Sequence, residues 1–174
     1  MSEGNTLKAG QVAAAIEPDF KSIDHIAIAV HDLEQAIPLF TEVLGFTLVR
    51  RREIKGRRTG MISAEIECGD VRLVLCQGTE PDSQVSKLVS NYGPGVAHIA
   101  IAVDDVRGIA DTLKSRGVEF ETTVIEGPGL RQVFTRRDPN SGMSFEFIER
   151  TSEHGFLQEN IRELFEQLEK ADAY

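Results

Sequence analysis

The chain has 174 residues, of which 41% are hydrophobic and 27% are charged, so it predicts one globular domain or two small fused modules. A formal net charge of −9 disfavours nucleic acid or an anionic membrane as a partner, and no apolar run approaches the length of a membrane span. Two cysteines make no disulfide framework, which favours the reducing cytoplasm.

Residues 1–21 lack a basic start followed by an apolar core, so they are predicted to be a loosely ordered lead-in and not a secretory signal. Short basic clusters occur further along, at residues 50–52, 57–58 and 136–137. Because each cluster is short, we expect all of them to form solvated faces.

The hexapeptide HIAIAV at residues 25–30 predicts the first strand of a longer unit. Asp32 then predicts the start of an amphipathic helix, Gly45 predicts its end, and Pro38 predicts a bend within it. Another strand follows the glycine. The unit is therefore βαβββ, and its last two strands are predicted at residues 60–68 and 71–76.

The same hexapeptide recurs at residues 98–103, and its histidine lies 98 − 25 = 73 residues after the first one. Asp105 again predicts a helix start and Gly117 a helix end, followed by another strand. This second unit is also βαβββ, and its last two strands are predicted at residues 132–136 and 143–149.

Two copies of one unit predict an α+β fold, in which paired modules form a curved mixed sheet around a cavity with helices outside. The predicted domain covers residues 22–150, with modules at about 22–80 and 95–150. Residues 151–174 are predicted to add a C-terminal lid helix. Its apolar stripe would be Ile161, Leu164, Phe165 and Leu168.

Alternate side chains of a strand face opposite sides, so each hexapeptide has a branched face and a face that joins one histidine to two alanines. The small faces are His25, Ala27 and Ala29 in the first copy, and His98, Ala100 and Ala102 in the second. If both line one concavity, the histidines converge beside empty volume, as a ligand cavity requires. The alternative is that each histidine is a satisfied core residue.

Glu146 is a candidate third ligand, because an acid between Phe145 and Phe147 on a strand is costly to bury without a cation or hydrogen-bond donors. Two imidazoles and one carboxylate match the facial triad of non-haem Fe(II) enzymes, which leaves positions open for substrate and O₂. We therefore predict a metal site made of His25, His98 and Glu146.

The repeat also predicts what the first module contributes. Aligning LVLCQ with FEFIE sets Val74 against Glu146, and valine cannot bind a metal. The predicted site is therefore asymmetric and has three ligands, unless Gln77 or another neighbour reaches in. Glu149, near the end of its strand, is expected to be solvated.

These features resemble the vicinal oxygen chelate superfamily and, within it, the catalytic half of 4-hydroxyphenylpyruvate dioxygenase and hydroxymandelate synthase. The resemblance runs from about Ser22 to the C-terminus. It rests on the segments IDHIAIAV, GMISAEI, EPDSQVSKLVSNYGPGVAHIAIAV, LRQVFT, FEFIER and HGFLQENIRELFEQLE.

The resemblance implies that the predicted triad binds iron and that Ser63 and Gln132 face the substrate. It also implies that Phe156 is an aromatic wall near the metal and that Asn160 belongs to the lid helix. Without the resemblance, each of these four would be an ordinary ladder, surface or core residue.

The chain departs from the dioxygenases at positions where they carry amides. It has Cys76 near the end of the first module's last strand, Ala97 just before the second ligand histidine, and Ser86 in the connecting segment. The long excursion of their second module is short here. These departures imply that the scaffold and metal are shared but that the substrate differs.

The leading functional interpretation is an Fe(II)-dependent dioxygenase that acts on O₂ and a small 2-oxo acid or a related chelating substrate. Co, Ni, Zn or Mn could replace iron. The first alternative is a redox-neutral isomerase, epimerase or glyoxalase-type lyase, a class that the resemblance associates with four protein ligands. The second is a small-molecule-binding resistance-type protein. The chain is expected to be a monomer or homodimer.

Overall fold

The computed structural model describes residues 17–127, 129–151, 166–167 and 170. The first module contains β1 (Phe20–Ala29), α1 (Leu33–Pro38), η1 (Leu39–Val43), β2 (Thr47–Lys55), β3 (Gly60–Cys68) and β4 (Val71–Gly78). Helix α2 (Gln84–Tyr92) connects it to the second module. That module contains β5 (Gly95–Val103), α3 (Val106–Ser115), β6 (Ile125–Gly127), β7 (Leu130–Phe134) and β8 (Phe145–Arg150).

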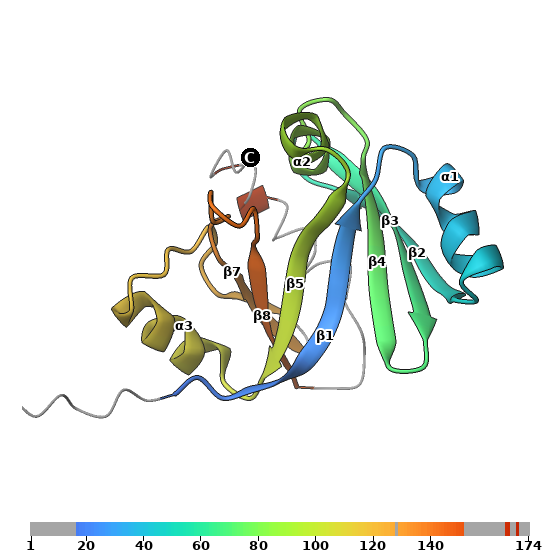
Figure 1. The fold of residues 1–174 in the computed structure, drawn as a ribbon. Coiled ribbons are helices and arrows are strands. Elements are labelled where there is room, and N and C mark those ends of the chain that lie inside the picture. The colour runs from blue at the N-terminus through green and yellow to red at the C-terminus, as the bar shows by residue number, and fades with distance from the viewer. Residues whose placement is uncertain (1–16, 128, 152–165, 168–169, 171–174) are drawn as a thin grey trace, which may run out of the picture.

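All eight strands form one mixed sheet in the order β2-β3-β4-β1-β5-β8-β7-β6 (Figure 1). From one edge to the centre the first module has the order β2-β3-β4-β1. From the other edge the second module has the order β6-β7-β8-β5, which is the same arrangement of equivalent strands. β1 and β5 pair antiparallel at the centre, while β1 with β4 and β5 with β8 are parallel pairs. The curved mixed sheet confirms the predicted fold class.

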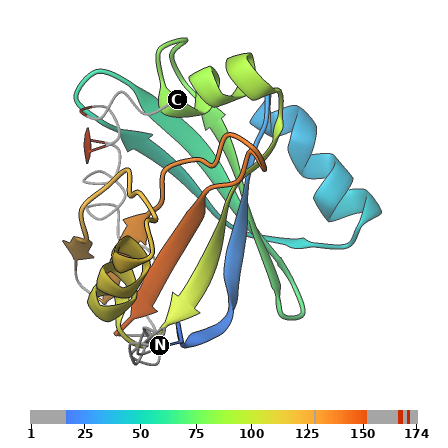
Figure 2. The same ribbon diagram turned by 60° about the vertical axis from the view of Figure 1, so that its left-hand side comes forward.

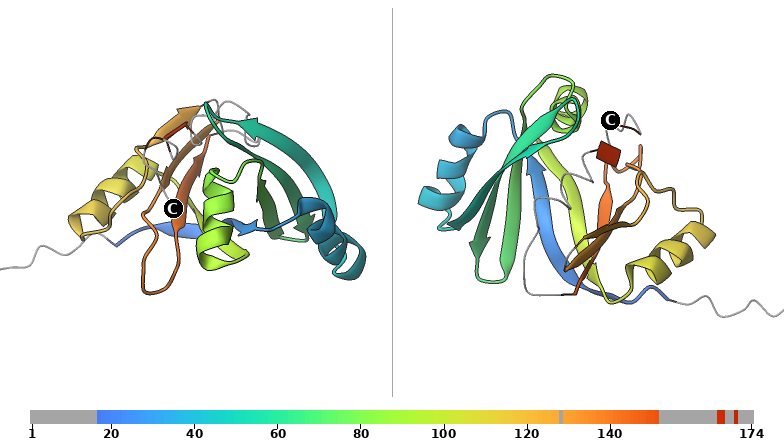
Figure 3. Two further views of the ribbon diagram at one scale, coloured as in Figure 1. Left: turned by 90° about the horizontal axis from the view of Figure 1, so that it is seen from above. Right: turned by 180° about the vertical axis from the view of Figure 1, so that it is seen from behind.

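Helices α1 and α3 lie on the outside of the curve, at opposite sides of the molecule (Figures 2 and 3). Each covers the apolar face of its own module's strands. The first core contains Leu33, Ile37, Ala64, Ile66, Leu73 and Leu75. The second contains Val103, Val106, Ile109, Ala110, Leu113, Val133 and Phe147. The branched faces of β1 and β5 thus pack under helices, which leaves the opposite face for a cavity.

The two helices begin at the residues that the sequence predicts. Asp32 Oδ1 accepts a hydrogen bond of 2.9 Å from the Gln35 N–H, and Asp105 Oδ1 accepts one of 3.0 Å from the Gly108 N–H. Each start has a second acceptor from the last strand of its module. Gln77 Oε1 accepts from Leu33 N–H at 2.7 Å, and Glu149 Oε2 accepts from Val106 N–H at 3.1 Å.

Two details differ from the sequence-based expectations. Glu149 is not solvated, because its side chain is only 12% exposed and also accepts a 2.6 Å hydrogen bond from Arg131. After Gly117 the chain forms only an isolated bridge at Phe120, and the strand β6 begins later, at Ile125.

Pro38 does more than bend the first helix, because α1 ends there and continues as the π-helix η1. The Leu44 N–H reaches the Leu39 carbonyl at 3.1 Å, five residues back. Proline has no N–H and crowds the preceding turn, which accounts for the change of helix type at this point.

The predicted lid helix lies almost entirely outside the described residues, and so do Phe156, Asn160 and the stripe Ile161, Leu164, Phe165 and Leu168. Two described helical residues contact the body. Glu166 forms an ion pair of 3.3 Å with Arg57, and Gln167 Oε1 accepts a 3.2 Å hydrogen bond from Thr123 N–H. These contacts reach both modules. Among the described residues, no helix is long and apolar enough to cross a membrane.

Candidate metal centre

The two repeated histidines lie on the concave face of the central strand pair. In the register of β1 with β5, His25 faces Ala100 and Ala27 faces His98. The two imidazole rings are therefore diagonal neighbours, with centroids 5.6 Å apart and an interplanar angle of 80°. Ala27 and Ala100 are fully buried between them, and their small side chains leave room in front of the rings.

Glu146 completes a group of three. β8 pairs with β5 so that Glu146 faces Ala100, which puts its carboxylate beside both rings. Its Oε2 lies 3.4 Å from His25 Nε2 and 3.3 Å from His98 Nε2. The three candidate ligand atoms lie within 4.8 Å of one another. The structure therefore brings together all three residues that the sequence predicts as ligands.

The carboxylate of Glu146 tests whether a metal fits here. The side chain is 1% exposed, and its Oε1 has no hydrogen-bond partner among the described residues. An acid in such surroundings costs several kcal/mol unless a cation or donors compensate it. Two imidazoles and one carboxylate are a donor set for a divalent transition metal, so the residues fit the group.

A β-bulge orients His25. Ile23 pairs with Ile101 and His25 with Ala100, so Asp24 is an extra residue in β1. Adjacent side chains of a regular strand face opposite sides, but here Asp24 Oδ1 lies 2.9 Å from His25 Nδ1. When Nδ1–H donates to this carboxylate, the lone pair of Nε2 is left for a metal, which is the arrangement of metal-binding histidines.

Arg150 fixes Asp24 in turn, because its Nε and Nη2 donate to the two carboxylate oxygens at 2.6 and 2.7 Å. Burial alone would raise the pKa of Asp24. Hydrogen bonds from Arg150 and His25 outweigh it and hold this pKa well below its usual range. Asp24 is therefore an ionised acceptor for His25.

His98 is held differently. Ala97 precedes it at the position of Asp24, and its ring packs edge-on against Phe134 with centroids 5.2 Å apart. Burial lowers the pKa of His98, while the nearby Glu146 opposes that shift. At neutral pH the imidazole is thus uncharged, which is the form that binds a metal.

A cavity opens in front of the three residues. Ser63 and Gln132, predicted to face the substrate, both line it and are 4% and 1% exposed. Neither amide atom of Gln132 has a hydrogen-bond partner among the described residues. The other lining residues are His25, Ala27, Arg52, Met61, Val74, Cys76, His98, Phe134 and Glu146.

The register supports the predicted asymmetry. Val74 faces Ala27 in the first module as Glu146 faces Ala100 in the second, so valine occupies the position of the carboxylate. The amide of Gln77 does not replace it, because its Oε1 accepts from the start of α1. Burial raises the pKa of Cys76 to about 12, so the cavity there holds a neutral thiol.

The expectation of a solvated arginine cluster is wrong for Arg52. Its side chain is 11% exposed, lines the cavity, and lies 3.4 Å from Glu65 (Nη1 to Oε2). The preceding Arg51 is exposed and pairs with Glu34 on the outer surface. Three consecutive arginines gave no signal for which one would face inward, because strand phase depends on pairing.

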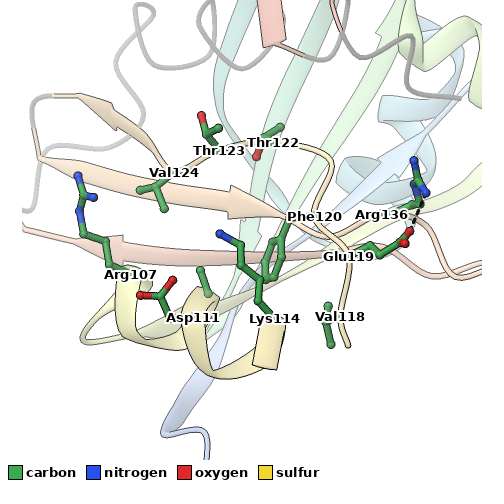
Figure 4. Close-up of a pocket in the computed structure, with 11 residues that line it drawn as sticks. Arg107, Asp111, Lys114, Val118, Glu119, Phe120, Thr122, Thr123, Val124 and Arg136 are labelled. Atoms are coloured by element: carbon green, nitrogen blue, oxygen red, sulfur yellow. Dashed lines mark hydrogen bonds and ion pairs between the residues drawn. The ribbon is translucent and has the colours of Figure 1, made fainter. Parts of the chain in front are cut away.

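A second concavity lies between α3 and the segment that precedes β6 (Figure 4). Several of its charged side chains have partners within the same concavity. Arg136 binds Glu119 at 2.6 Å, and the Lys114 ammonium lies 5.5 Å from the centre of the Phe120 ring. No described residue lines both concavities. None of the three candidate ligands lines this second concavity.

Comparisons with known proteins agree with the geometry. The sequence profile described as Glyoxalase/Bleomycin resistance protein/Dioxygenase superfamily matches residues 22–147. The chain is 28% identical to 4-hydroxyphenylpyruvate dioxygenase of Pseudomonas aeruginosa, over 75% of this chain and 46% of that one. The chain spans about half the length of the curated relatives it matches first.

Two solved structures show the same fold. A mutant of 4-hydroxymandelate synthase from Streptomyces coelicolor superimposes with a TM-score of 0.76 at 23% identity, covering 85% of this chain and 53% of that one. Methylmalonyl-CoA epimerase from Mycobacterium tuberculosis superimposes with a TM-score of 0.66 at 25% identity. That match covers 82% of this chain and 95% of the epimerase.

Proposed function

Because the chain belongs to the glyoxalase/bleomycin resistance protein/dioxygenase superfamily, we propose that it is an Fe(II)-dependent dioxygenase of a small 2-oxo acid. The observation that carries the proposal is the three-residue site with apolar Val74 at the equivalent fourth position. Two histidines and one carboxylate on one side of a metal leave the other side open for a chelating substrate and O₂.

His25, His98 and Glu146 would hold the metal. When bound, it would supply a Lewis-acidic redox centre to which the two oxygens of a 2-oxo acid and O₂ have access. The protein's own part is to fix these ligands and to keep water out. Asp24 holds His25 in the metal-binding tautomer, and burial among Phe134 and the alanines keeps His98 neutral.

The polar groups of the cavity supply substrate orientation. The Gln132 amide and the Ser63 hydroxyl are buried on strands of different modules, so they approach the cavity from opposite sides. A buried amide without a partner costs free energy unless a ligand supplies one. We therefore assign the role of hydrogen-bonding the bound substrate to Gln132, with Ser63 opposite it.

A redox-neutral isomerase or lyase is the second candidate. It is favoured by the epimerase structure, of which this chain covers 95%, whereas it covers only 46% of the dioxygenase. The apolar Val74 favours the oxygenase, because it leaves one coordination position without a protein ligand. A binding protein without a metal is disfavoured by the buried carboxylate of Glu146, whose Oε1 has no hydrogen-bond partner among the described residues.

Oxygen uptake separates these candidates. The full chain is loaded anaerobically with Fe(II), mixed with a panel of 2-oxo acids and followed with an oxygen electrode. We expect uptake that depends on both the 2-oxo acid and iron. Glu146→Ala should abolish it, and Glu119→Ala, an exposed acid outside the cavity, should leave it unchanged. An iron-loaded protein without 2-oxo acid-dependent uptake contradicts the dioxygenase.

A further inference from the structure

Each of the two candidate metal histidines directly follows a β-bulge. Asp24 is the extra residue before His25 in β1. Two consecutive residues of β1 pair with His98 and Val96, so Ala97 is likewise an extra residue, this time in β5. The two extra residues are 97 − 24 = 73 residues apart, which is the offset of the repeat itself. The bulge is therefore a duplicated feature of the site.

The two bulge residues are held in different ways. Arg150 holds Asp24 through its side-chain carboxylate. Ala97 has no polar side chain, but its backbone carbonyl accepts a 2.6 Å hydrogen bond from Nη2 of Arg137. A bulge residue lacks its regular ladder partner, so its backbone groups need partners from elsewhere. An arginine thus holds the residue before each histidine.

Arg137 connects three segments of the chain. Its Nη1 donates a hydrogen bond to the Gly142 carbonyl, in the segment that leads into β8. The guanidinium carbon lies 5.7 Å from the centre of the Tyr92 ring, at the end of α2. A planar guanidinium can contact two carbonyls and an aromatic face at once, whereas a lysine ammonium is a point charge without that fork. The half-buried Arg137 therefore joins the start of β5 to α2 and to the segment before β8.

These contacts fix the backbone of His98 relative to Glu146. On the other side of His98, the Ile99 N–H donates to the Ser144 carbonyl at 3.2 Å. The peptide groups before and after His98 are therefore both bound to the β7–β8 connection, either through Arg137 or directly. Glu146 follows Ser144 by two residues in the same segment. Because metal ligands must be held within about 0.5 Å of their working geometry, this link matters for the site.

We propose that Arg137 is a positioning residue of the metal centre, which holds the backbone at His98 so that its imidazole and Glu146 meet one metal. Arg137 is not among the described residues that line the cavity, so it acts through His98 and not on the substrate. The sequence predicted a solvated cluster at residues 136–137, and only Arg136 fits that prediction, because it is 64% exposed and pairs with Glu119. This inference rests on the metal site of the proposed function.

The test uses the full chain and the variant Arg137→Met, which keeps the length of the side-chain stem but removes all its donors. Equilibrium dialysis under argon should show Fe(II) binding weakened by roughly 10–100-fold, the range for loss of a residue that supports a ligand. The second readout is the visible absorption spectrum of the protein saturated with Co(II), because its bands report the ligand geometry. We expect these bands to change in position or intensity. A loss of stability alone would leave the spectrum of the saturated, folded protein unchanged.

Two further variants serve as controls. Arg136→Met removes the same charge from the preceding, exposed residue and should leave both readouts at wild-type values. Arg137→Lys keeps the charge and a donor toward Ala97 and should recover part of the affinity. If Arg137→Met does not fold, Arg137→Gln takes its place, since its amide can donate to the Ala97 carbonyl but cannot reproduce the fork. It should change both readouts in the same direction.

Wild-type Fe(II) affinity in Arg137→Met overturns the inference. Weaker binding with an unchanged Co(II) spectrum at saturation also overturns it, because the ligand geometry then does not depend on Arg137. Both results leave the proposed function intact. A wild-type chain that binds iron but shows no 2-oxo acid-dependent oxygen uptake contradicts only the dioxygenase, and one that binds no divalent metal contradicts the proposed function and this inference together.

Discussion

The two modules follow the same strand plan, but they present different side chains to the concave face at five equivalent positions. Strand register makes the equivalent pairs Arg52 and Ile125, Ser63 and Gln132, Glu65 and Phe134, Val74 and Glu146, and Cys76 and Ile148. Only the hexapeptide positions, each histidine with its two alanines, are the same in both. The repeated hexapeptide thus builds the frame, and the differences around it determine what the cavity can bind.

The contrast extends to the support of each histidine. His25 is oriented by the ionised Asp24, which Arg150 holds in place. His98 follows Ala97 and is oriented by burial against Phe134. The first module therefore supplies the acceptor Asp24, and the second supplies both Arg150, which holds Asp24, and the carboxylate ligand. A metal bound between them would depend on both modules for different reasons.

The largest expected effect comes from what the modules share. His25→Ala and His98→Ala should each reduce Fe(II) affinity by more than the roughly 100-fold that loss of a supporting residue can cost. Equilibrium dialysis against Fe(II) under argon measures it. The control is His31→Ala, an exposed histidine outside the triad. Wild-type affinity in either triad variant would show that the histidines do not act together.

A smaller loss should follow from removing the support that only the first module has. Asp24→Asn keeps the shape of the side chain but removes its charge, so it should weaken Fe(II) binding by about 10–100-fold. Asp104→Asn, an exposed acid paired with Lys21, is the matched control. Unchanged affinity in the Asp24 variant would mean that the ring of His25, like that of His98, is oriented by packing alone and needs no charged partner.

Glu146 is the ligand that has no counterpart in the first module. Replacing it should raise stability in the metal-free protein and lower stability in the Fe(II)-bound protein. Without metal, Glu146→Val should raise the free energy of unfolding by about 1–2 kcal/mol, because an apolar residue replaces a poorly compensated buried acid. With Fe(II), the same variant should be less stable than the wild type, because it loses ligand-linked stabilisation. Urea denaturation measures both. A metal-free variant that is less stable than the wild type would show that the protein alone satisfies Glu146.

The smallest expected effect concerns a phenolic hydroxyl on the substrate. Cys76 and Ala97 cannot make the paired contacts of an amide, and Ala97 is not among the described residues that line the cavity. The ratio of kcat/KM for 4-hydroxyphenylpyruvate to that for phenylpyruvate should therefore lie close to one. A preference above roughly 100-fold would mean that another residue recognises the hydroxyl.

Much of this arrangement could be predicted from the sequence, because the duplication fixes several features at once. The hexapeptide sets strand phase, so it predicts that His25 and His98 share a face with alanines. The offset between the copies then predicts that Val74 occupies the position in the first module that Glu146 occupies in the second. The register of β4 with β1 and of β8 with β5 agrees. The aspartates at both helix starts were also readable, since N-cap chemistry is local.

The residues that escaped prediction depend on non-local pairing. Asp24 reaches His25 only through a bulge against β5, and the sequence gives no sign of that extra residue. Arg52 lies in a run of three arginines, and only the pairing of β2 with β3 decides which one turns inward. Glu149 contacts a helix start 43 residues away in the chain, so its burial was not visible locally.

The most direct test of a single centre with an unequal contribution from the modules is the iron content after anaerobic loading and desalting. We predict a single Fe(II) per chain in the wild type, almost none in Glu146→Ala, and wild-type content in Val74→Ala, which alters the equivalent position of the other module. Retained iron in Glu146→Ala, or lost iron in Val74→Ala, would contradict the account.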